Sequence, residues 1–300
     1  MLAISELHKS YGTTQALAGV SLRVGPGEMV GFVGANGAGK STTMRIAMGL
    51  LAADSGTVRW HDRPLTFATR QRFGYMPEER GLYPKMRVVE QVAYFGKLRG
   101  MRGADADAAA QRLVEQMDVV AEPHDFVQSL SLGNQQRVQL AAAMVHDPEL
   151  LILDEPFSGL DPVGVDTMAD VLSHRRAQGT GVLFSSHQLE LVERLCDRVV
   201  IVRSGTIADG TLAELRSQGA RDELEITVEA DPSWVAAIGG VRVLERAGNR
   251  IVLALDDPGD DQSVLAAASA AGRVEQFGRR QPSLAEIYRE AISETPGVER

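Results

Sequence analysis

The chain contains 300 residues, of which 44% are hydrophobic and 24% are charged, and its formal net charge at pH 7 is −9. These values are typical of a globular chain that builds a hydrophobic core, and the length favours about two domains. The acidic balance argues against a general nucleic-acid binder, which needs a basic face, so no nucleic-acid partner is expected. The single cysteine, Cys196, excludes an intramolecular disulfide.

No apolar run in the sequence is long enough to cross a bilayer, because the longest runs have the length of a strand and end in charged residues. The first residues also lack the basic-then-apolar pattern of a signal peptide. We therefore expect the chain to stay in the cytoplasm. Work at a membrane would require a second polypeptide to supply the spanning part.

Residues 2–7 and 17–24 alternate between apolar and polar positions, as half-buried strands do. A helix is expected at 42–48, directly after a short glycine-rich segment. The expected strands lie at residues 2–7, 17–24, 29–33, 57–60 and 72–76.

The segment from Gly34 to Ser41 reads Gly-Ala-Asn-Gly-Ala-Gly-Lys-Ser and lies between the expected strand at 29–33 and the expected helix. This context is typical of a phosphate-binding loop, because glycines let successive backbone N–H groups face one anion and the helix N-terminus adds partial positive charge. A glycine-rich turn that binds nothing is the alternative. The candidate nucleotide-binding residues are Gly34, Asn36, Gly37, Gly39, Lys40, Ser41 and Thr42.

Two of these residues have specific expected roles. Lys40 would reach the β- and γ-phosphates, and the Ser41 hydroxyl would ligate Mg²⁺. ATP and Mg²⁺ are therefore the expected cofactors.

From about residue 88 the apolar period becomes helical, with expected helices at 88–98, 106–120 and 134–145. Buried strands at 150–153 and 182–185 and covering helices after residue 166 and at 189–195 then return the chain to an α/β pattern. A helical subdomain of about residues 88–146 is thus predicted inside an α/β domain of residues 1–215.

Residues 222–300 are predicted to form a small, separate α+β domain that nucleotide binding does not need, since no phosphate-binding motif occurs there. A hairpin turn is expected around Gly248. The expected strands are 224–228, 241–244 and 251–255, and the expected short helices are 234–238, 263–271 and 284–292.

The apolar run at 150–153 ends in two carboxylates, Asp154 and Glu155. A carboxylate at a strand end near a phosphate loop can hold Mg²⁺, directly or through water, which is the expected role of Asp154. Glu155 could polarise the attacking water as a general base.

With these motifs in view, the sequence resembles the ATP-binding cassette (ABC) ATPase subunits of transporters. Residues 130–137, Leu-Ser-Leu-Gly-Asn-Gln-Gln-Arg, are similar to the family signature Leu-Ser-Gly-Gly-Gln-Gln-Gln-Arg. Residues 158–161, Ser-Gly-Leu-Asp, match its D-loop. His187 matches its switch histidine, and Tyr11 lies where the family places an adenine-stacking aromatic. The motifs follow the family order over about residues 1–215.

The resemblance implies further roles. Ser131 and Gly133 would contact the γ-phosphate of the ATP that a second copy of the chain binds, and His187 would sense or hold the γ-phosphate. It also implies a P-loop NTPase fold of the ABC type, ATP hydrolysis by Lys40, Glu155 and His187, and ATP-driven dimerisation. An integral-membrane permease, encoded separately, would hold the chain at the inner face of the cell membrane.

Two departures from the family pattern stand out. Leu132 and Asn134 replace a glycine and a glutamine of the signature, which we interpret as tolerated because Ser131 and Gly133 remain. Glu78 lies where the family has a glutamine that approaches Mg²⁺ and links the site to the membrane half. We expect Glu78 to approach the metal; a solvated charged turn is the alternative.

Three features are similar to bacterial exporter ATPases of the sodium-efflux and antibiotic-resistance type. They are Glu78 with the residues after it, the variant signature, and the tail motif around Tyr288.

The alternatives are a soluble ABC ATPase that acts on ribosomes, a DNA-repair or chromosome ATPase, and a binding module that does not hydrolyse ATP. A single cassette without a charged linker disfavours the first, and the lack of long heptad repeats disfavours the second. The presence of Lys40, Asp154, Glu155 and His187 disfavours the third.

Overall fold

The computed structural model describes residues 1–120, 125–218 and 223–294, and the chain divides into two compact units. The first unit contains Met1–Leu212 and the chain from Tyr288 onward, and the second contains Ala213–Ile287. The division thus assigns Tyr288 and the residues after it to the first unit, whereas the sequence pattern placed all of 222–300 in one domain. Residues 121–124 of the expected helical subdomain, and residues 222 and 295–300 of the expected C-terminal domain, lie outside the described residues.

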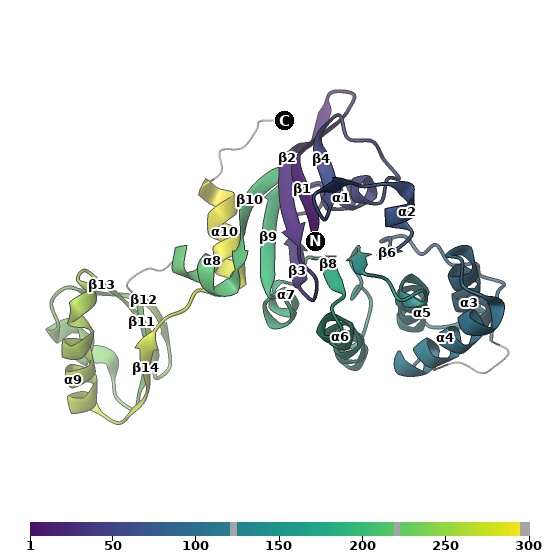
Figure 1. Cartoon of the computed structure of the whole chain (residues 1–300). Helices are drawn as coiled ribbons and strands as arrows, with labels where there is room; N and C mark the ends of the chain where they lie inside the picture. The colour runs from purple at the N-terminus through teal and green to yellow at the C-terminus, as the bar shows by residue number, and fades with distance from the viewer. Residues whose placement is uncertain (121–124, 219–222, 295–300) are drawn as a thin grey trace. The chain divides into compact units, whose positions relative to one another are not determined.

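A six-stranded sheet forms the centre of the first unit (Figure 1). Its neighbouring strands pair in parallel except at one edge, where β10 pairs with β9 in the antiparallel sense. In spatial order the strands are β10 (Gly205–Thr211), β9 (Arg198–Arg203), β3 (Met29–Val33), β8 (Gly181–Ser186), β7 (Leu150–Leu153) and β6 (Phe73–Met76). Every residue of β3, β7 and β8 is buried, which explains the apolar runs in these strands; in β8 the run ends at Phe184.

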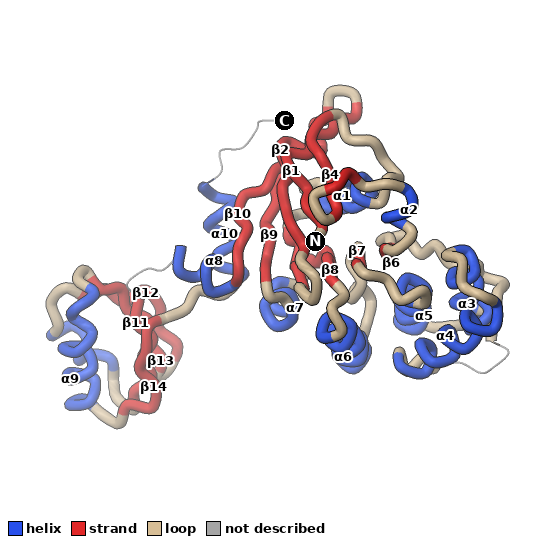
Figure 2. Tube along the Cα trace, viewed as in Figure 1, coloured by secondary structure: helices blue, strands red, loops and turns tan. Residues whose placement is uncertain are grey.

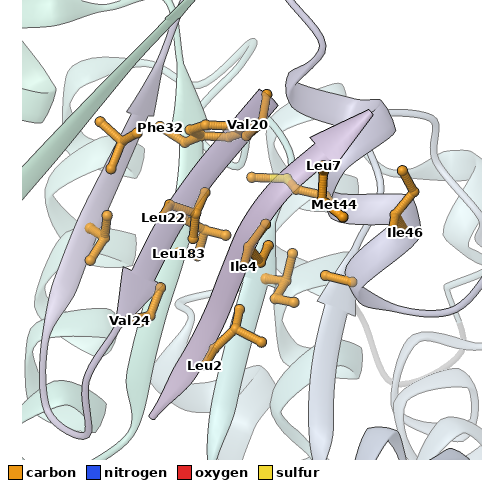
Figure 3. Packing of buried hydrophobic residues seen from close by; sticks show 14 of the residues in the cluster. Leu2, Ile4, Leu7, Val20, Leu22, Val24, Phe32, Met44, Ile46 and Leu183 are labelled. Atoms are coloured by element: carbon orange, nitrogen blue, oxygen red, sulfur yellow. The ribbon is translucent and has the colours of Figure 1, made fainter. Parts of the chain in front are cut away.

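An antiparallel sheet covers one face of the parallel sheet. Its spatial order is β2 (Thr14–Val24), β1 (Leu2–Tyr11), β4 (Ser55–Trp60) and β5 (Arg63–Pro64). The main core lies between the two sheets and α1 (Lys40–Ala47), and Figure 3 shows side chains of β1 and β2 meeting Phe32, Leu183 and Met44. This packing fixes the position of β3 and of the loop that follows it.

Two groups of helices complete the first unit. Helices α6 (Pro162–Ala177) and α7 (Leu189–Leu195) pack on strands β8 and β3. The second group, α3 (Val88–Leu98), α4 (Gly103–Gln116) and α5 (Leu132–Met144), packs together and meets the parallel sheet at β6 (Figure 1). The remaining short segments of this unit are α2 (Phe67–Arg70) and the 3₁₀ turn Val127–Ser129. Helix α8 (Leu212–Gln218) belongs to the second unit from Ala213 onward.

Helix boundaries differ from the sequence prediction where capping decides them. Helix α5 begins at Leu132, two residues before the expected start, because the Ser131 side chain caps it by accepting a hydrogen bond from Asn134 N. Helix α4 ends at Gln116 and not near residue 120, since Asp118 has a left-handed φ of 48°.

The second unit contains an antiparallel sheet with α9 (Asp261–Ala271) on one face (Figure 2). Its spatial order is β12 (Val241–Ala247), β13 (Arg250–Leu255), β11 (Glu223–Val228) and β14 (Val274–Arg279). The expected hairpin around Gly248 is confirmed, because Ala247 pairs with Arg250. The expected helix at 234–238 is a 3₁₀ segment, Pro232–Ala237, and a second 3₁₀ turn lies at Pro258–Asp260.

Helix α10 (Leu284–Glu294) crosses the division between the units after Ile287. Its C-terminal part lies beside β9, where Arg203 Nη1 donates to the Ile292 carbonyl at 3.1 Å (Figure 1). Four strands, β5, β9, β10 and β14, were not predicted from the sequence. Among the described residues, no helix combines the length and the apolar character needed to span a membrane.

Candidate nucleotide-binding and catalytic site

The candidate site lies at the edge of the parallel sheet where four neighbouring strands end. The phosphate-binding loop follows β3, His187 follows β8, Asp154 and Glu155 follow β7, and Glu78 lies two residues after β6. The carboxyl ends of parallel strands meet at one edge of a sheet. Residues more than 100 positions apart in the sequence therefore lie at the same edge.

The phosphate-binding loop needs its glycines for space and for backbone conformation. Gly39, the residue before α1, has a φ of 98°, and a Cβ there would lie 2.4 Å from Leu17 Cδ2. A Cβ on Gly34 would lie 2.6 Å from the Val202 carbonyl oxygen. The main core therefore presses against the outer side of the loop, and only glycine fits these two positions.

No side chain caps the start of α1, so N–H groups of its first turn remain available to an anion. Lys40, the first residue of α1, is only 7% exposed, and its Nζ donates to the carbonyls of Gly34 at 2.7 Å and of Ala35 at 3.2 Å. The lysine ammonium is thus held inside the curve of the loop. Ser41 and Thr42 follow it in the same turn, and both are half-buried.

Asp154 lies at the end of β7 with 1% exposure, and its backbone N–H donates to the Met76 carbonyl at 2.8 Å. Its Oδ1 accepts a 2.7 Å hydrogen bond from Ser185 Oγ of β8. A buried carboxylate near a phosphate loop is a ligand type that Mg²⁺ prefers, and the Ser41 hydroxyl is another. The uncapped loop with Lys40 fits a triphosphate, and the oxygen donors fit a hard divalent cation.

Glu155 and His187 lie in contact, a pairing that the sequence analysis did not predict. His187 Nδ1 and Glu155 Oε2 are 3.0 Å apart, and the side chain of Glu155 is 12% exposed whereas that of His187 is 60% exposed. The histidine thus lies on the open side of a nearly buried carboxylate. This pair joins the ends of β7 and β8 and can orient the carboxylate toward a water molecule.

Glu78 is exposed, two residues after the end of β6. Within the described ranges no cluster of three His, Cys, Asp or Glu side chains could hold a metal ion. The neighbouring backbone is held, because Gln139 Nε2 of α5 donates to the Pro77 carbonyl at 2.7 Å. The approach of Glu78 to Mg²⁺ therefore stays a prediction.

The signature segment forms the start of α5, with Ser131 exposed at its N-terminus. Neither Leu132 nor Gly133 has a positive φ, so the leucine does not strain a position that needs glycine. Asn134 exchanges hydrogen bonds with the backbone of Val120, at 3.2 Å to its carbonyl and 3.4 Å from its N–H. The two unusual signature residues thus fit the fold without distortion.

Tyr11 lies at the end of β1 with 50% of its surface exposed, and Lys9 Nζ lies 5.9 Å from its ring centroid. An exposed aromatic ring is available for stacking on a base. Its contact with adenine stays a prediction.

The sequence interpretation missed three residues that the structure brings to this site. Ser185 and Gln136 bond to the Asp154–Glu155 segment, and both are polar residues within buried stretches, which was a usable signal. The third is Tyr288 of α10. Burial raises the pKa of its phenol, and a hydrogen bond with the backbone of Ala35 in the phosphate-binding loop lowers it by less.

Comparison with known proteins agrees with this geometry. The family model described as ABC transporter matches residues 17–158, and the model described as ATP-binding protein DrrA1-3-like, C-terminal domain, matches residues 210–292. The chain is 35% identical over 293 residues to the uncharacterized ABC transporter ATP-binding protein YhaQ of Bacillus subtilis, covering 97% of this chain and 98% of that protein. The chain belongs to the family of ABC transporter ATP-binding proteins, which are ATPases.

Two further similarities are informative. The chain is 30% identical over 297 residues to the daunorubicin resistance ATP-binding protein DrrA3 of Streptomyces coeruleorubidus, covering 96% of this chain and 94% of that protein. A solved structure of an ATP-binding subunit of an ABC transporter superposes with a TM-score of 0.67 at 32% identity, covering 73% of this chain and 93% of that one. The predicted ABC-type P-loop fold with an added C-terminal domain is therefore confirmed.

Proposed function

We propose that this chain is the ATP-hydrolysing subunit of a membrane exporter. Two copies dimerise around ATP and drive a separately encoded permease, which holds them at the inner face of the cell membrane. Support comes from the DrrA-like C-terminal domain and from the similarity to a protein named for daunorubicin resistance.

Each candidate residue has one role in this proposal. Lys40 and the loop amides bind the phosphates, Asn36 and Thr42 line the same loop, and Tyr11 stacks on the base. Ser41 and Asp154 hold Mg²⁺, which polarises phosphate oxygens when bound, and Glu78 reaches its water shell. Ser131 and Gly133 bind the γ-phosphate held by the second copy, since an exposed helix N-terminus suits an anion.

The observation that carries the hydrolytic role is the 3.0 Å pair of Glu155 and His187 beside the buried Asp154. Glu155 accepts the proton of the attacking water, and His187 holds the carboxylate in place and faces the γ-phosphate. A carboxamide at position 155 removes the base and leaves the phosphate loop intact.

We expect Glu155→Gln to lower the ATP turnover rate by about 100-fold or more while MgATP affinity stays within about threefold. The variant should form an ATP-bound dimer, seen as a shift in size-exclusion elution with ATP. Glu149→Gln is the matched control, because Glu149 lies before the other end of β7 and pairs with Arg72. Turnover at the wild-type rate in Glu155→Gln would refute the general-base role.

Purification from membranes tests the exporter role against the ribosomal alternative. The tagged chain should co-purify with one integral-membrane protein of several spanning helices, identified by mass spectrometry, and its ATPase activity should rise in that complex. Recovery with ribosomal proteins and no membrane protein would contradict the proposal.

A further inference from the structure

Glu155 has an unusual backbone conformation for a residue with a side chain. Its φ is 49°, in the left-handed region that strains a residue with a Cβ, and such a conformation persists only where the surroundings hold it. Both peptide groups that flank Glu155 are bonded to buried side chains from other elements.

The first of these side chains is Ser185 of β8, which is fully buried. Its Oγ accepts a 2.8 Å hydrogen bond from Glu155 N–H and donates at 2.7 Å to Asp154 Oδ1. One hydroxyl therefore connects the candidate metal ligand to the backbone of the candidate base. The three residues before it, Val182, Leu183 and Phe184, are apolar, so this serine is the point where β8 becomes polar.

The second is Gln136 of α5, which is 4% exposed. Its Nε2 donates to the Glu155 carbonyl at 3.1 Å and to the Pro156 carbonyl at 2.9 Å. Helix α5 begins immediately after Ser131, so Gln136 lies in the second turn of the helix that presents the signature. A shift of this helix would act directly on the backbone of Glu155.

We propose that Ser185 and Gln136 are positioning residues that hold Glu155 in its left-handed conformation and so aim its carboxylate. Ser185 fixes it relative to Asp154, and Gln136 fixes it relative to the signature helix. Placing the signature against a second copy's ATP then also sets the position of the base. The inference rests on the proposed role of Glu155.

The test measures steady-state ATP hydrolysis by the full chain. We expect Ser185→Ala and Gln136→Met each to lower kcat by about 10- to 100-fold with KM for ATP within about threefold, because a small misplacement of a reacting group costs rate more than binding. Ser185→Thr keeps the hydroxyl and should recover most of the activity. If Ser185→Ala does not fold, Ser185→Cys replaces it, since a thiol is a weak donor of similar shape.

Matched controls remove similar buried bonds elsewhere. Thr180→Val removes a buried hydroxyl, just before β8, that donates to the Pro148 carbonyl at 3.4 Å. Gln91→Met removes a fully buried amide of α3 whose Oε1 accepts a 2.7 Å hydrogen bond from Tyr83 N–H. Both should keep kcat within about threefold of wild type. Equal losses in the controls and in the two test variants would overturn the proposal.

A second arm separates this inference from the proposed function. In a Glu155→Gln background, Ser185→Ala and Gln136→Met should lower the residual rate no further, since residues that act through one group are not additive. Wild-type turnover by Glu155→Gln alone would refute the base assignment. Two outcomes would refute the positioning role only. One is a low kcat in Glu155→Gln with wild-type kcat in Ser185→Ala and Gln136→Met. The other is a fully additive loss of kcat in the combined variants.

Discussion

The two units of the chain use buried polar side chains in different ways. In the first unit such side chains gather at the ends of the parallel strands, where Lys40, Asp154, Ser185 and Gln136 are all less than 9% exposed. In the described part of the second unit, Glu223 is the one buried polar side chain, and it pairs with Arg280 at 2.8 Å.

Buried polar groups serve a candidate binding site in the first unit and hold secondary-structure elements together in the second. Burial of a polar group costs free energy unless hydrogen bonds replace its contacts with water. The second unit meets that requirement with ion pairs between its own elements, such as Glu225 with Arg250. The first unit instead places the charges of Lys40 and Asp154 near the uncapped start of α1. A bound phosphate and a divalent cation would there supply the opposite charges. We therefore expect changes in the two units to separate nucleotide binding from stability.

The largest effect is expected for Lys40→Ala. Removal of the one ammonium that the loop encloses should weaken MgATP binding by about 100-fold or more, because charge-assisted bonds to phosphate are lost. Fluorescent-nucleotide titration measures this. Lys97→Ala is the control, since Lys97 forms a surface ion pair with Asp107. Unchanged ATP affinity in Lys40→Ala would remove the phosphate-loop assignment.

Arg280→Met is expected to affect stability alone. It leaves Glu223 buried without its cation and also removes the bond to Glu286, so the second unit should lose about 2 kcal/mol or more of stability. Thermal unfolding of the full chain should show an earlier transition while MgATP affinity stays within about twofold. A large loss of ATP affinity in a folded Arg280→Met protein would show that the units do not separate the two properties.

The two units should also respond to acid at different pH values. Burial, together with the charge of Arg99, lowers the pKa of His146 in the first unit to about 4, from 6.5 when it is unfolded. As the pH falls below 6.5, His146 is protonated in the unfolded state but stays neutral in the folded state. The first unit therefore loses stability until the pH reaches about 4, where the folded state is protonated too.

The second unit should resist acid for longer. The hydrogen bond from Arg250 lowers the pKa of Glu225 below its ordinary 4.5. The stability that this ion pair contributes is therefore fully present above pH 4.5 and is lost only at lower pH. Hydrogen exchange of the full chain at pH 7 and 5 should show loss of protection in the first unit only. His146→Gln should reduce that loss. Equal loss in both units would contradict the prediction.

The smallest effect is expected for Tyr288→Phe. It removes a hydrogen bond with the backbone of Ala35, so stability should fall by about 1 kcal/mol and MgATP affinity should change by less than about threefold. A tenfold change in affinity would instead make this tyrosine of the first unit part of the nucleotide site.

Local sequence was sufficient for the parts of the site that one short segment creates. The glycines before Lys40 have the conformations that only glycine adopts easily, and the apolar run before Asp154 has the composition of a buried strand. The two main strands of the hairpin around Gly248 were predicted for the same reason. In these segments the residue type determines the local backbone conformation or burial directly, so the local sequence was enough to predict the structure.

Tertiary structure decided which segments meet. The order β3, β8, β7, β6 brings His187 to Glu155 and places Ser185 between Asp154 and the backbone of Glu155, although 30 residues or more separate them in the chain. Gln136 reaches Glu155 from α5, and Tyr288 reaches Ala35 from α10. The strands β9 and β14 also took their place through pairing with distant partners. Hydrogen bonds between distant elements depend on where a whole sheet places its edges, and no local pattern of residues encodes that placement.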